Sequence, residues 1–259
     1  MEAKEPRSNS VKSILKAFAI LEELDRGVEL SLAEVSERLA MDKGTAFRLL
    51  ATMREAGYVT QNPESKRYSN SLKLFAMGNR VADHSGFRQI ARPFLEELAE
   101  KSGETANLSL RIGNDMVFVD KVETTETIKA GLSIGITVPM YCTGMGKAVL
   151  AFMKEEEAEA VIDGFDFRPY TKDTVTSKEE LNHKLAEVRK QGFCLDVEEY
   201  VESLICFAAP IFDYHRNPVG AISVSSPKFR YDPERTDEEF SRLIKETAAK
   251  ISRQIGYNA

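Results

Sequence analysis

LSLAEVSERLAMDKGTAFRLLATMREAGYV, residues 30–59, is the stretch that decides how the first part of this chain folds. Ser31 and Glu34 have the spacing of a capping box, in which each side chain accepts a hydrogen bond from the backbone N–H of the other residue. Such a box starts a helix, and the apolar residues that follow it predict that this helix covers residues 32–39.

A second helix is predicted after a short turn at residues 40–42. Asp42 can cap its first turn, and Gly57 ends it after about residue 56. Two short helices joined in this way form a helix-turn-helix. The second helix of such a motif fits the major groove of DNA.

The helix predicted from residue 43 to residue 56 has two chemically different faces. An apolar face for the core is formed by Ala46, Leu49, Leu50 and Met53. A polar face that suits base edges and phosphates is formed by Lys43, Thr45, Arg48 and Thr52. Phe47 lies at the border between the two faces. Packing at the edge of the core is its simpler interpretation, and contact with a thymine methyl group is the alternative.

A hairpin with a basic tip is predicted next. Residues 58–61 and 67–70 read as two strands around residues 62–66, which form a wing. Lys66 and Arg67 would reach phosphates, which position a protein on DNA without specifying the sequence. An amphipathic helix over residues 11–24 precedes the whole module. The residues expected to contact DNA are Lys43, Thr45, Phe47, Arg48, Thr52, Lys66 and Arg67.

The charge of the chain is unevenly distributed. Its net charge of -6 would by itself disfavour a nucleic-acid partner. Residues 43–80 nevertheless carry a net charge of +5, and residues 81–259 carry -8. The total therefore hides a basic module in front of a larger acidic domain.

Composition excludes several other classes of protein. A chain of 259 residues with 42% apolar residues is long enough for about two domains and too apolar to be disordered. Its longest apolar stretch, residues 204–212, is too short to span a bilayer. The first ten residues lack the apolar segment of a secretory signal. Three cysteines without a CxxC pair indicate reduced thiols in the cytoplasm, and we expect no metal or cofactor.

A further helix is predicted from Ser71 to about residue 83. Its apolar stripe is formed by Leu72, Phe75 and Ala76, and Asn79 lies on the same side of the helix. This stripe can contact a second copy of the chain or pack on the helix over residues 11–24, and spacing alone does not decide between them. Residues 84–86, His-Ser-Gly, read as a hinge.

The remaining sequence predicts an antiparallel sheet covered by helices, an α+β domain. Strands are expected over residues 107–112, 116–122, 128–132, 193–197, 206–212 and 219–225. Helices are expected to end at Gly103 and Gly192, and a final helix is expected to start at a cap at Thr236. In the first strand, apolar residues alternate with Asn107 and Ser109, which predicts one buried and one exposed face.

One glycine-rich turn is a candidate binding site. Gly144 and Gly146 precede a predicted helix, where open backbone N–H groups can seat an anion. A plain tight turn is the simpler interpretation of an isolated G-x-G. Further candidate side chains lie in other predicted strands. Ser223 and Ser225 are two residues apart in one strand, so they face the same side of it. Asp196 and Cys206 lie in two other strands. A small cavity lined by these groups would suit a short carboxylate.

Most of the chain resembles the IclR family of bacterial transcriptional regulators. The N-terminal part of the resemblance is carried by SVKSILKAFAILEEL, by residues 30–59 and by KRYSNSLKLFAMG. The C-terminal part is carried by VPMYCTGMGKAVLAF, GFCLDVEEYVESLICFAAPIFD and AISVSSP. The resemblance implies a winged helix-turn-helix that binds double-stranded operator DNA as a homodimer or homotetramer. It also implies a GAF-like domain that binds a small carboxylate effector.

The resemblance extends to individual positions and to the organisation of the chain. It implies that the amides of Gly144 and Met145 hold the effector carboxylate, and that the rest of the pocket is lined by Asp196, Cys206, Ser223 and Ser225. The implied organisation is a winged helix-turn-helix domain over residues 1–71, a linker helix over residues 72–86 and an effector-binding domain over residues 87–259. Within the family, the chain most resembles regulators of 2-keto-3-deoxygluconate use.

Two residues depart from the family pattern. Gly44 stands where a small hydroxyl residue is expected, and glycine costs a helix up to about 1 kcal/mol. Ser203 stands where a glycine is expected, which predicts either a strained loop or a different one.

An enzyme is the alternative class, namely a cysteine-dependent hydrolase or another enzyme acting on a carboxylate substrate. Cys142 or Cys206 would be its nucleophile, with a histidine as the base. His84, His183 and His215 all fall outside the segments assigned to the pocket, so we expect no catalytic residues. The resemblance implies instead a repressor whose operator affinity is modulated by a small organic acid, such as a keto acid or sugar acid.

Overall fold

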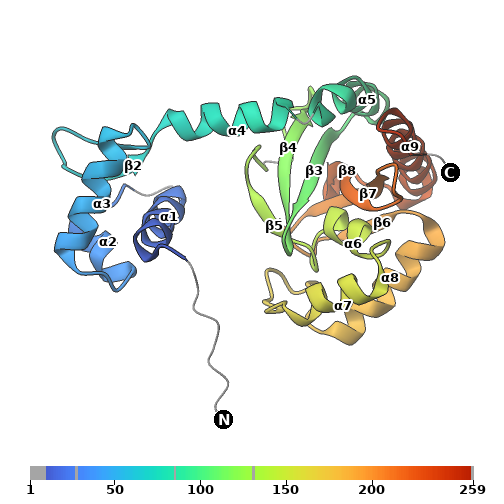
Figure 1. Cartoon of the computed structure of the whole chain (residues 1–259). Helices are drawn as coiled ribbons and strands as arrows, with labels where there is room; N and C mark the ends of the chain where they lie inside the picture. Colours follow the sequence, from blue (N-terminus) through green and yellow to red (C-terminus); the bar gives the residue numbers. More distant parts are fainter. Residues whose placement is uncertain (1–9, 27–28, 85, 130–131, 258–259) are drawn as a thin grey trace, which may run out of the picture. The chain divides into compact units, whose positions relative to one another are not determined.

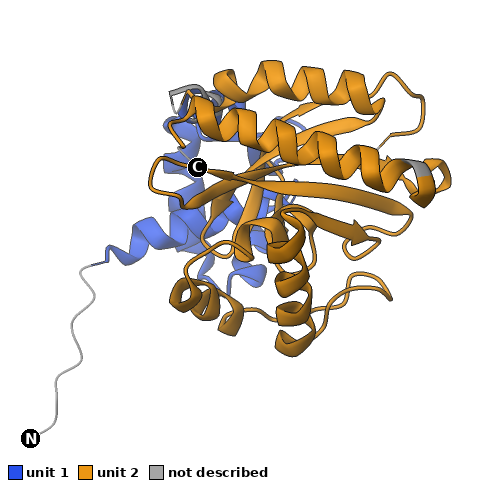
Figure 2. Cartoon of the chain, turned by 90° about the vertical axis from the view of Figure 1, so that its right-hand side faces the viewer, with its two compact units in different colours: residues 1–84 blue, residues 85–259 orange. Residues whose placement is uncertain are grey.

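The computed structural model divides into two compact units, residues 1–84 and residues 85–259 (Figure 2). It describes residues 10–26, 29–84, 86–129 and 132–257, apart from the side chains of residues 79, 82–84 and 235. Ser85 of the expected hinge lies outside the described residues.

The first unit contains the predicted helix-turn-helix (Figure 1). Helix α1 covers Lys12–Asp25, α2 covers Leu32–Arg38 and α3 covers Lys43–Glu55. The capping box is present, because the Ser31 hydroxyl accepts from the Glu34 N–H and the Glu34 carboxylate accepts from the Ser31 N–H. Asp42 caps α3 by accepting from the N–H groups of Gly44 and Thr45. These local hydrogen bonds fix where both helices begin.

A small core and a hairpin complete this unit. The core includes Ile20, Leu30, Val35, Leu50 and Val59, all buried. Strands β1 (Val59–Gln61) and β2 (Tyr68–Asn70) form the antiparallel wing, and helix α4 covers Leu72–His84.

The apolar stripe of α4 does not pack on α1. On α4, Leu72 is 83% exposed and Phe75 is 65% exposed. The apolar face of α1 is also open, at Val11, Ile14, Leu15 and Phe18. The interpretation that these two helices cover one another is therefore wrong, and both apolar faces remain open.

The second unit is an α+β domain around one six-stranded antiparallel sheet, ordered β5-β4-β3-β8-β7-β6. The strands are β3 (Thr105–Ile112), β4 (Asp115–Val122), β5 (Thr137–Pro139), β6 (Cys194–Val197), β7 (Leu204–Phe212) and β8 (Pro218–Pro227). Helices α5 (Phe87–Ser102) and α9 (Pro233–Gln254) cover one face. The other face carries α6 (Gly144–Leu150), α7 (Glu155–Asp163) and α8 (Lys178–Gln191). The predicted fold class is confirmed.

Three local predictions for this unit are wrong. The described residues 128, 129 and 132 are not in a strand, and the edge strand is β5 instead; residues 130–131 lie outside the described residues. Helix α9 begins before Thr236, because Asp232 caps it and a proline occupies its first position. Strand β3 is not half-exposed, since Asn107 and Ser109 are buried beneath α6. Helices on both faces of the sheet remove the exposed face that alternation predicts.

Candidate functional site

The outward face of α3 carries the side chains predicted to meet DNA. Lys43, Arg48 and Thr52 are exposed and Thr45 is half-buried, whereas Ala46, Leu50 and Met53 are buried in the core. Phe47 is 54% exposed, so its interpretation as a residue packed at the edge of the core is wrong. A basic and partly aromatic surface therefore projects from this helix.

In the wing, Arg67, one of the two residues predicted to contact phosphates, also makes hydrogen bonds within the protein. The Arg67 guanidinium donates to both carboxylate oxygens of Glu34 at 2.8 Å and to the carbonyl of Glu29 at 2.8 Å. Arg67 therefore ties the wing to the capping box of α2. Lys66 is exposed at the tip of the hairpin, where it can reach DNA. The Arg67 side chain is also 36% exposed, so its predicted phosphate contact stays a prediction.

We expect Glu34 to stay ionised at pH 3. Hydrogen bonds from Ser31 and then Arg67 lower its pKa from 4.5 to about 2. Its contribution to stability is therefore present above pH 4.5 and is lost as the pH falls from 4.5 through 2. NMR of the side-chain carboxyl carbon measures this directly. Arg67→Ala should raise the midpoint and Arg242→Ala should not; a wild-type midpoint near 4.5 would contradict the assignment.

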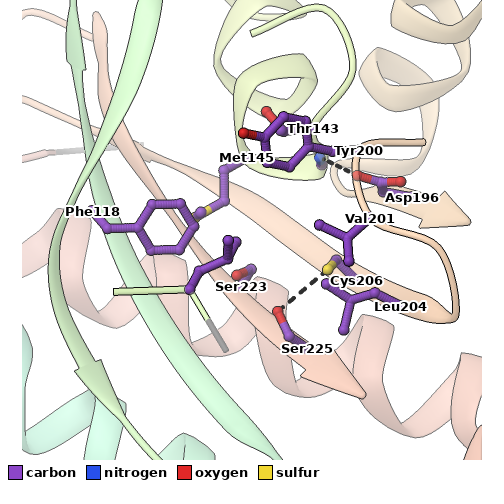
Figure 3. Close-up of a pocket in the computed structure, with 12 residues that line it drawn as sticks. Phe118, Thr143, Met145, Asp196, Tyr200, Val201, Leu204, Cys206, Ser223 and Ser225 are labelled. Carbon is purple, nitrogen blue, oxygen red and sulfur yellow. Dashed lines mark hydrogen bonds between the residues drawn. The ribbon is translucent and has the colours of Figure 1, made fainter. Parts of the chain in front are cut away.

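The six residues predicted to bind an effector line one pocket in the second unit, whose cavity volume is about 30 Å³ (Figure 3). They are Gly144, Met145, Asp196, Cys206, Ser223 and Ser225. The pocket also has lining residues that sequence reasoning missed: Phe118, Leu132, Thr143, Tyr200, Val201 and Leu204. Most of the missed side chains are apolar, and nothing in their local sequence separates them from core residues.

The glycine turn at the start of α6 is already bonded to protein. The Gly144 N–H donates to Asp196 Oδ2 at 2.8 Å, so this amide is not open to a carboxylate as expected. Thr143 caps the helix by accepting from the Gly146 N–H. The N–H of Glu199 donates to the other Asp196 oxygen at 3.1 Å. Burial raises the pKa of Asp196, and Lys147 opposes this effect.

Asn107 organises the polar side of the pocket. Its side-chain nitrogen donates to Ser223 Oγ at 3.2 Å and to Ser225 Oγ at 3.1 Å. Cys206 Sγ lies 3.3 Å from the same Ser225 oxygen. Asn107 was predicted to face solvent, yet it holds both serine hydroxyls in place.

A buried charge cluster lies behind the pocket. The Lys147 side chain is fully buried, and its Nζ lies 2.5 Å from Glu199 Oε2, while Lys184 pairs with Glu199 Oε1 at 2.9 Å. Burial opposes the positive charge of Lys147, but Asp196, Cys194 and Glu199 together outweigh it and raise the pKa of the ammonium group. Lys147 was not predicted, because a lysine in a short helix normally reads as exposed.

The loop over residues 198–203 contributes Tyr200 and Val201 to the pocket wall. Ser203 within it has a φ of 61°, a left-handed conformation that favours glycine. The strained-loop expectation for Ser203 is therefore confirmed. The Ser203 N–H donates to Glu198 Oε1 at 2.8 Å, which closes the loop on itself.

Ser203→Gly is expected to raise the free energy of unfolding by about 1 kcal/mol, because glycine adopts this conformation without the clash of a side chain. Urea unfolding followed by circular dichroism measures the change. Glu202→Gly is the matched control, since Glu202 is not among the residues with a positive φ, and it should not stabilise. A destabilised Ser203→Gly protein would contradict the account of strain.

The cysteines do not fit a nucleophile. Burial raises the pKa of the Cys206 thiol to about 12, so it is protonated at neutral pH. His183 is exposed on α8 and His215 is exposed in the turn between β7 and β8. In the described part of the chain, no three or more His, Cys, Asp or Glu residues are grouped so as to hold a metal ion.

Both units match known protein families. Residues 13–63 match the IclR helix-turn-helix domain, and residues 79–253 match the family described as bacterial transcriptional regulator IclR C-terminal. The chain belongs to the IclR family. Its members are DNA-binding transcriptional regulators, and the alternative of an enzyme has no support among its relatives.

Individual relatives cover nearly the whole chain. The HTH-type transcriptional regulator KdgR of Escherichia coli (strain K12) is 35% identical over 250 residues, covering 96% of this chain and 95% of its own. The transcriptional repressor IclR of the same organism is 31% identical over 254 residues, covering 97% and 92%. The crystal structure of Thermotoga maritima IclR matches with a TM-score of 0.72 at 32% identity, covering 95% and 99%. No described helix of this IclR-family chain is both long and apolar enough to cross a membrane.

Proposed function

We propose that this IclR-family protein is a cytoplasmic repressor whose affinity for operator DNA is modulated by a small organic acid. The observation that carries the proposal is the pocket of the second unit, where side chains from β7, β8, β6 and α6 converge. The similarity to a relative named a transcriptional repressor supports repression rather than activation. An effector acts by binding the DNA-competent and DNA-incompetent states with different affinities.

The lining of the pocket supports a keto acid or sugar acid as the effector class. Ser223, Ser225 and Asp196 offer hydroxyl and carboxyl groups to a small polar molecule, while Phe118 and Val201 supply apolar contact. Pockets of this kind combine an apolar lining with a few placed polar groups. The similarity to KdgR supports a role in carbohydrate catabolism.

The first unit supports a homodimer or homotetramer. The open apolar faces of α1 and α4 include Phe18 at 54%, Leu72 at 83% and Val81 at 73% exposure. Exposed apolar surface of this extent marks an interaction site, and a second copy of the chain would cover it. Such pairing would also present two α3 helices to two operator half-sites.

DNA binding is tested with Arg48→Ala. Binding of the full-length protein to DNA upstream of the neighbouring operon is measured by gel shift at several salt concentrations. Loss of a base contact should weaken specific binding by about 10- to 100-fold. Arg242→Ala, which removes an exposed cation of the second unit, is the control and should bind normally. Equal binding by wild type and Arg48→Ala would overturn the assignment of α3.

Effector binding is tested by calorimetry with a panel of keto acids and sugar acids. Ser223→Ala and Asp196→Ala should each weaken the best ligand about tenfold or more, because a buried polar contact is lost. Ser226→Ala is the matched control: it lies on the same strand, but its hydroxyl bonds to Glu104 outside the pocket. If both pocket variants keep every affinity of the wild type, the proposed site is wrong.

A further inference from the structure

Gly44 has no structural reason, within the chain, to be a glycine. It is not among the glycines with a positive φ. A Cβ built at Gly44 would meet the carboxylate oxygens of Asp42 at 3.5 and 3.7 Å, which is ordinary van der Waals contact. At Gly146, by contrast, a Cβ would lie 2.3 Å from the backbone of Met140, and at Gly220 it would lie 2.4 Å from a carbonyl oxygen. A helix without such a constraint is more stable with alanine.

Phe47 has no structural reason to be aromatic either. It is 54% exposed, and it does not belong to the described core of the first unit. Gly44 and Phe47 lie three residues apart, so they are neighbours on one face of α3. Arg48, four residues after Gly44, borders the same strip. The helix therefore presents a phenyl ring and a guanidinium on either side of a position with no side chain.

We propose that Gly44 lets the backbone of α3 approach the floor of the major groove, where Phe47 packs on the C5-methyl group of a thymine. Only thymine presents a methyl group in the major groove, and an apolar side chain reads it by contact. The net charge of +5 over residues 43–80 favours DNA over another protein as the partner of this surface. The proposal rests on DNA binding by α3, and it adds which base feature the helix reads and why a glycine precedes it.

The test begins with a site selected from random DNA by the full-length protein. Each thymine of that site is then replaced by deoxyuridine, which removes only the methyl group, and Kd is measured by fluorescence anisotropy at fixed salt. At the position read by Phe47, wild type should bind the deoxyuridine site about fourfold more weakly, the value expected for one buried methyl group. Phe47→Ala should bind both sites equally.

Phe18→Ala is the matched control, because Phe18 is also 54% exposed but lies on α1. Whatever its absolute affinity, it should keep the fourfold preference for thymine. If Phe47→Ala keeps that preference, or if no thymine in the site shows one, the reading of a methyl group is overturned. Selection of a site by wild type tests DNA binding itself. A failure of DNA binding is therefore distinguishable from a failure of Phe47 to recognise the methyl group.

Gly44→Ala tests the close approach independently. Its thermal midpoint should equal or exceed that of wild type, since the added Cβ has room and favours the helix. Binding to the selected site should fall about tenfold, whereas binding to unselected DNA, which depends on phosphate contacts, should change little. An unchanged ratio of selected to unselected binding would overturn the role of Gly44.

Discussion

Lys147→Met is expected to lower the free energy of unfolding of residues 85–259 by about 3–5 kcal/mol, the usual cost of removing one partner from a buried ion pair. Lys147 is fully buried, and its ammonium group lies 2.5 Å from Glu199, which is only 2% exposed. Asp196, 5% exposed, is a second carboxylate in the same cluster. Methionine would fill the volume but remove the ammonium group from both carboxylates, and only Glu199 would keep its ion pair with Lys184.

Urea unfolding of the full-length protein, followed by circular dichroism, measures this loss. Lys154→Met is the control: Lys154 is an exposed lysine, and its substitution should change stability by less than about 0.5 kcal/mol. Adding Glu199→Gln to Lys147→Met should recover part of the loss, because the carboxylate charge is then gone as well. A loss below about 1 kcal/mol for Lys147→Met alone would mean that the cluster is hydrated.

Local hydrogen-bonding patterns made much of the fold predictable. The caps at Ser31 and Asp42 and the helix ends at Gly103 and Gly192 all depend on partners within a few residues, so the sequence displays them directly. The wrong predictions concern elements whose structure depends on contacts with distant parts of the chain. The strand expected over residues 128–132 has the right residue types, but Ile128 is 60% exposed and β5 pairs with β4 instead.

The candidate site divides in the same way. Residue identity and family resemblance named six residues that line one pocket. They could not show that Gly144 is bonded to Asp196, 52 residues away, or that Asn107 holds Ser223 across 116 residues. Such contacts depend on strand register, which brings Asn107 opposite Ser223 and is not visible in either segment alone. The ion pair of Arg67 was not visible for a similar reason, because its partner Glu34 lies on a separate helix.

Gly146→Ala is expected to destabilise residues 85–259 by at least about 3 kcal/mol and to abolish ligand binding in the pocket. A Cβ at this position would lie 2.3 Å from both Cα and the carbonyl oxygen of Met140, and backbone atoms cannot yield as a flexible side chain can. Helix α6 would have to move away from the turn that precedes it. That movement would displace Gly144 and Met145, which line the pocket.

Gly144→Ala is the matched comparison in the same helix. Its Cβ would meet the Cβ atoms of Asp196 at 3.2 Å and of Ala208 at 3.4 Å, contacts that small shifts can relieve, so we expect a loss of about 1 kcal/mol. Urea unfolding and calorimetry with the best ligand of the panel distinguish the two variants. The contrast also decides why the turn contains two glycines. If Gly146→Ala is as stable as Gly144→Ala, close packing on Met140 does not explain the second glycine. If it is far less stable, close packing of the α6 backbone on Met140 requires it.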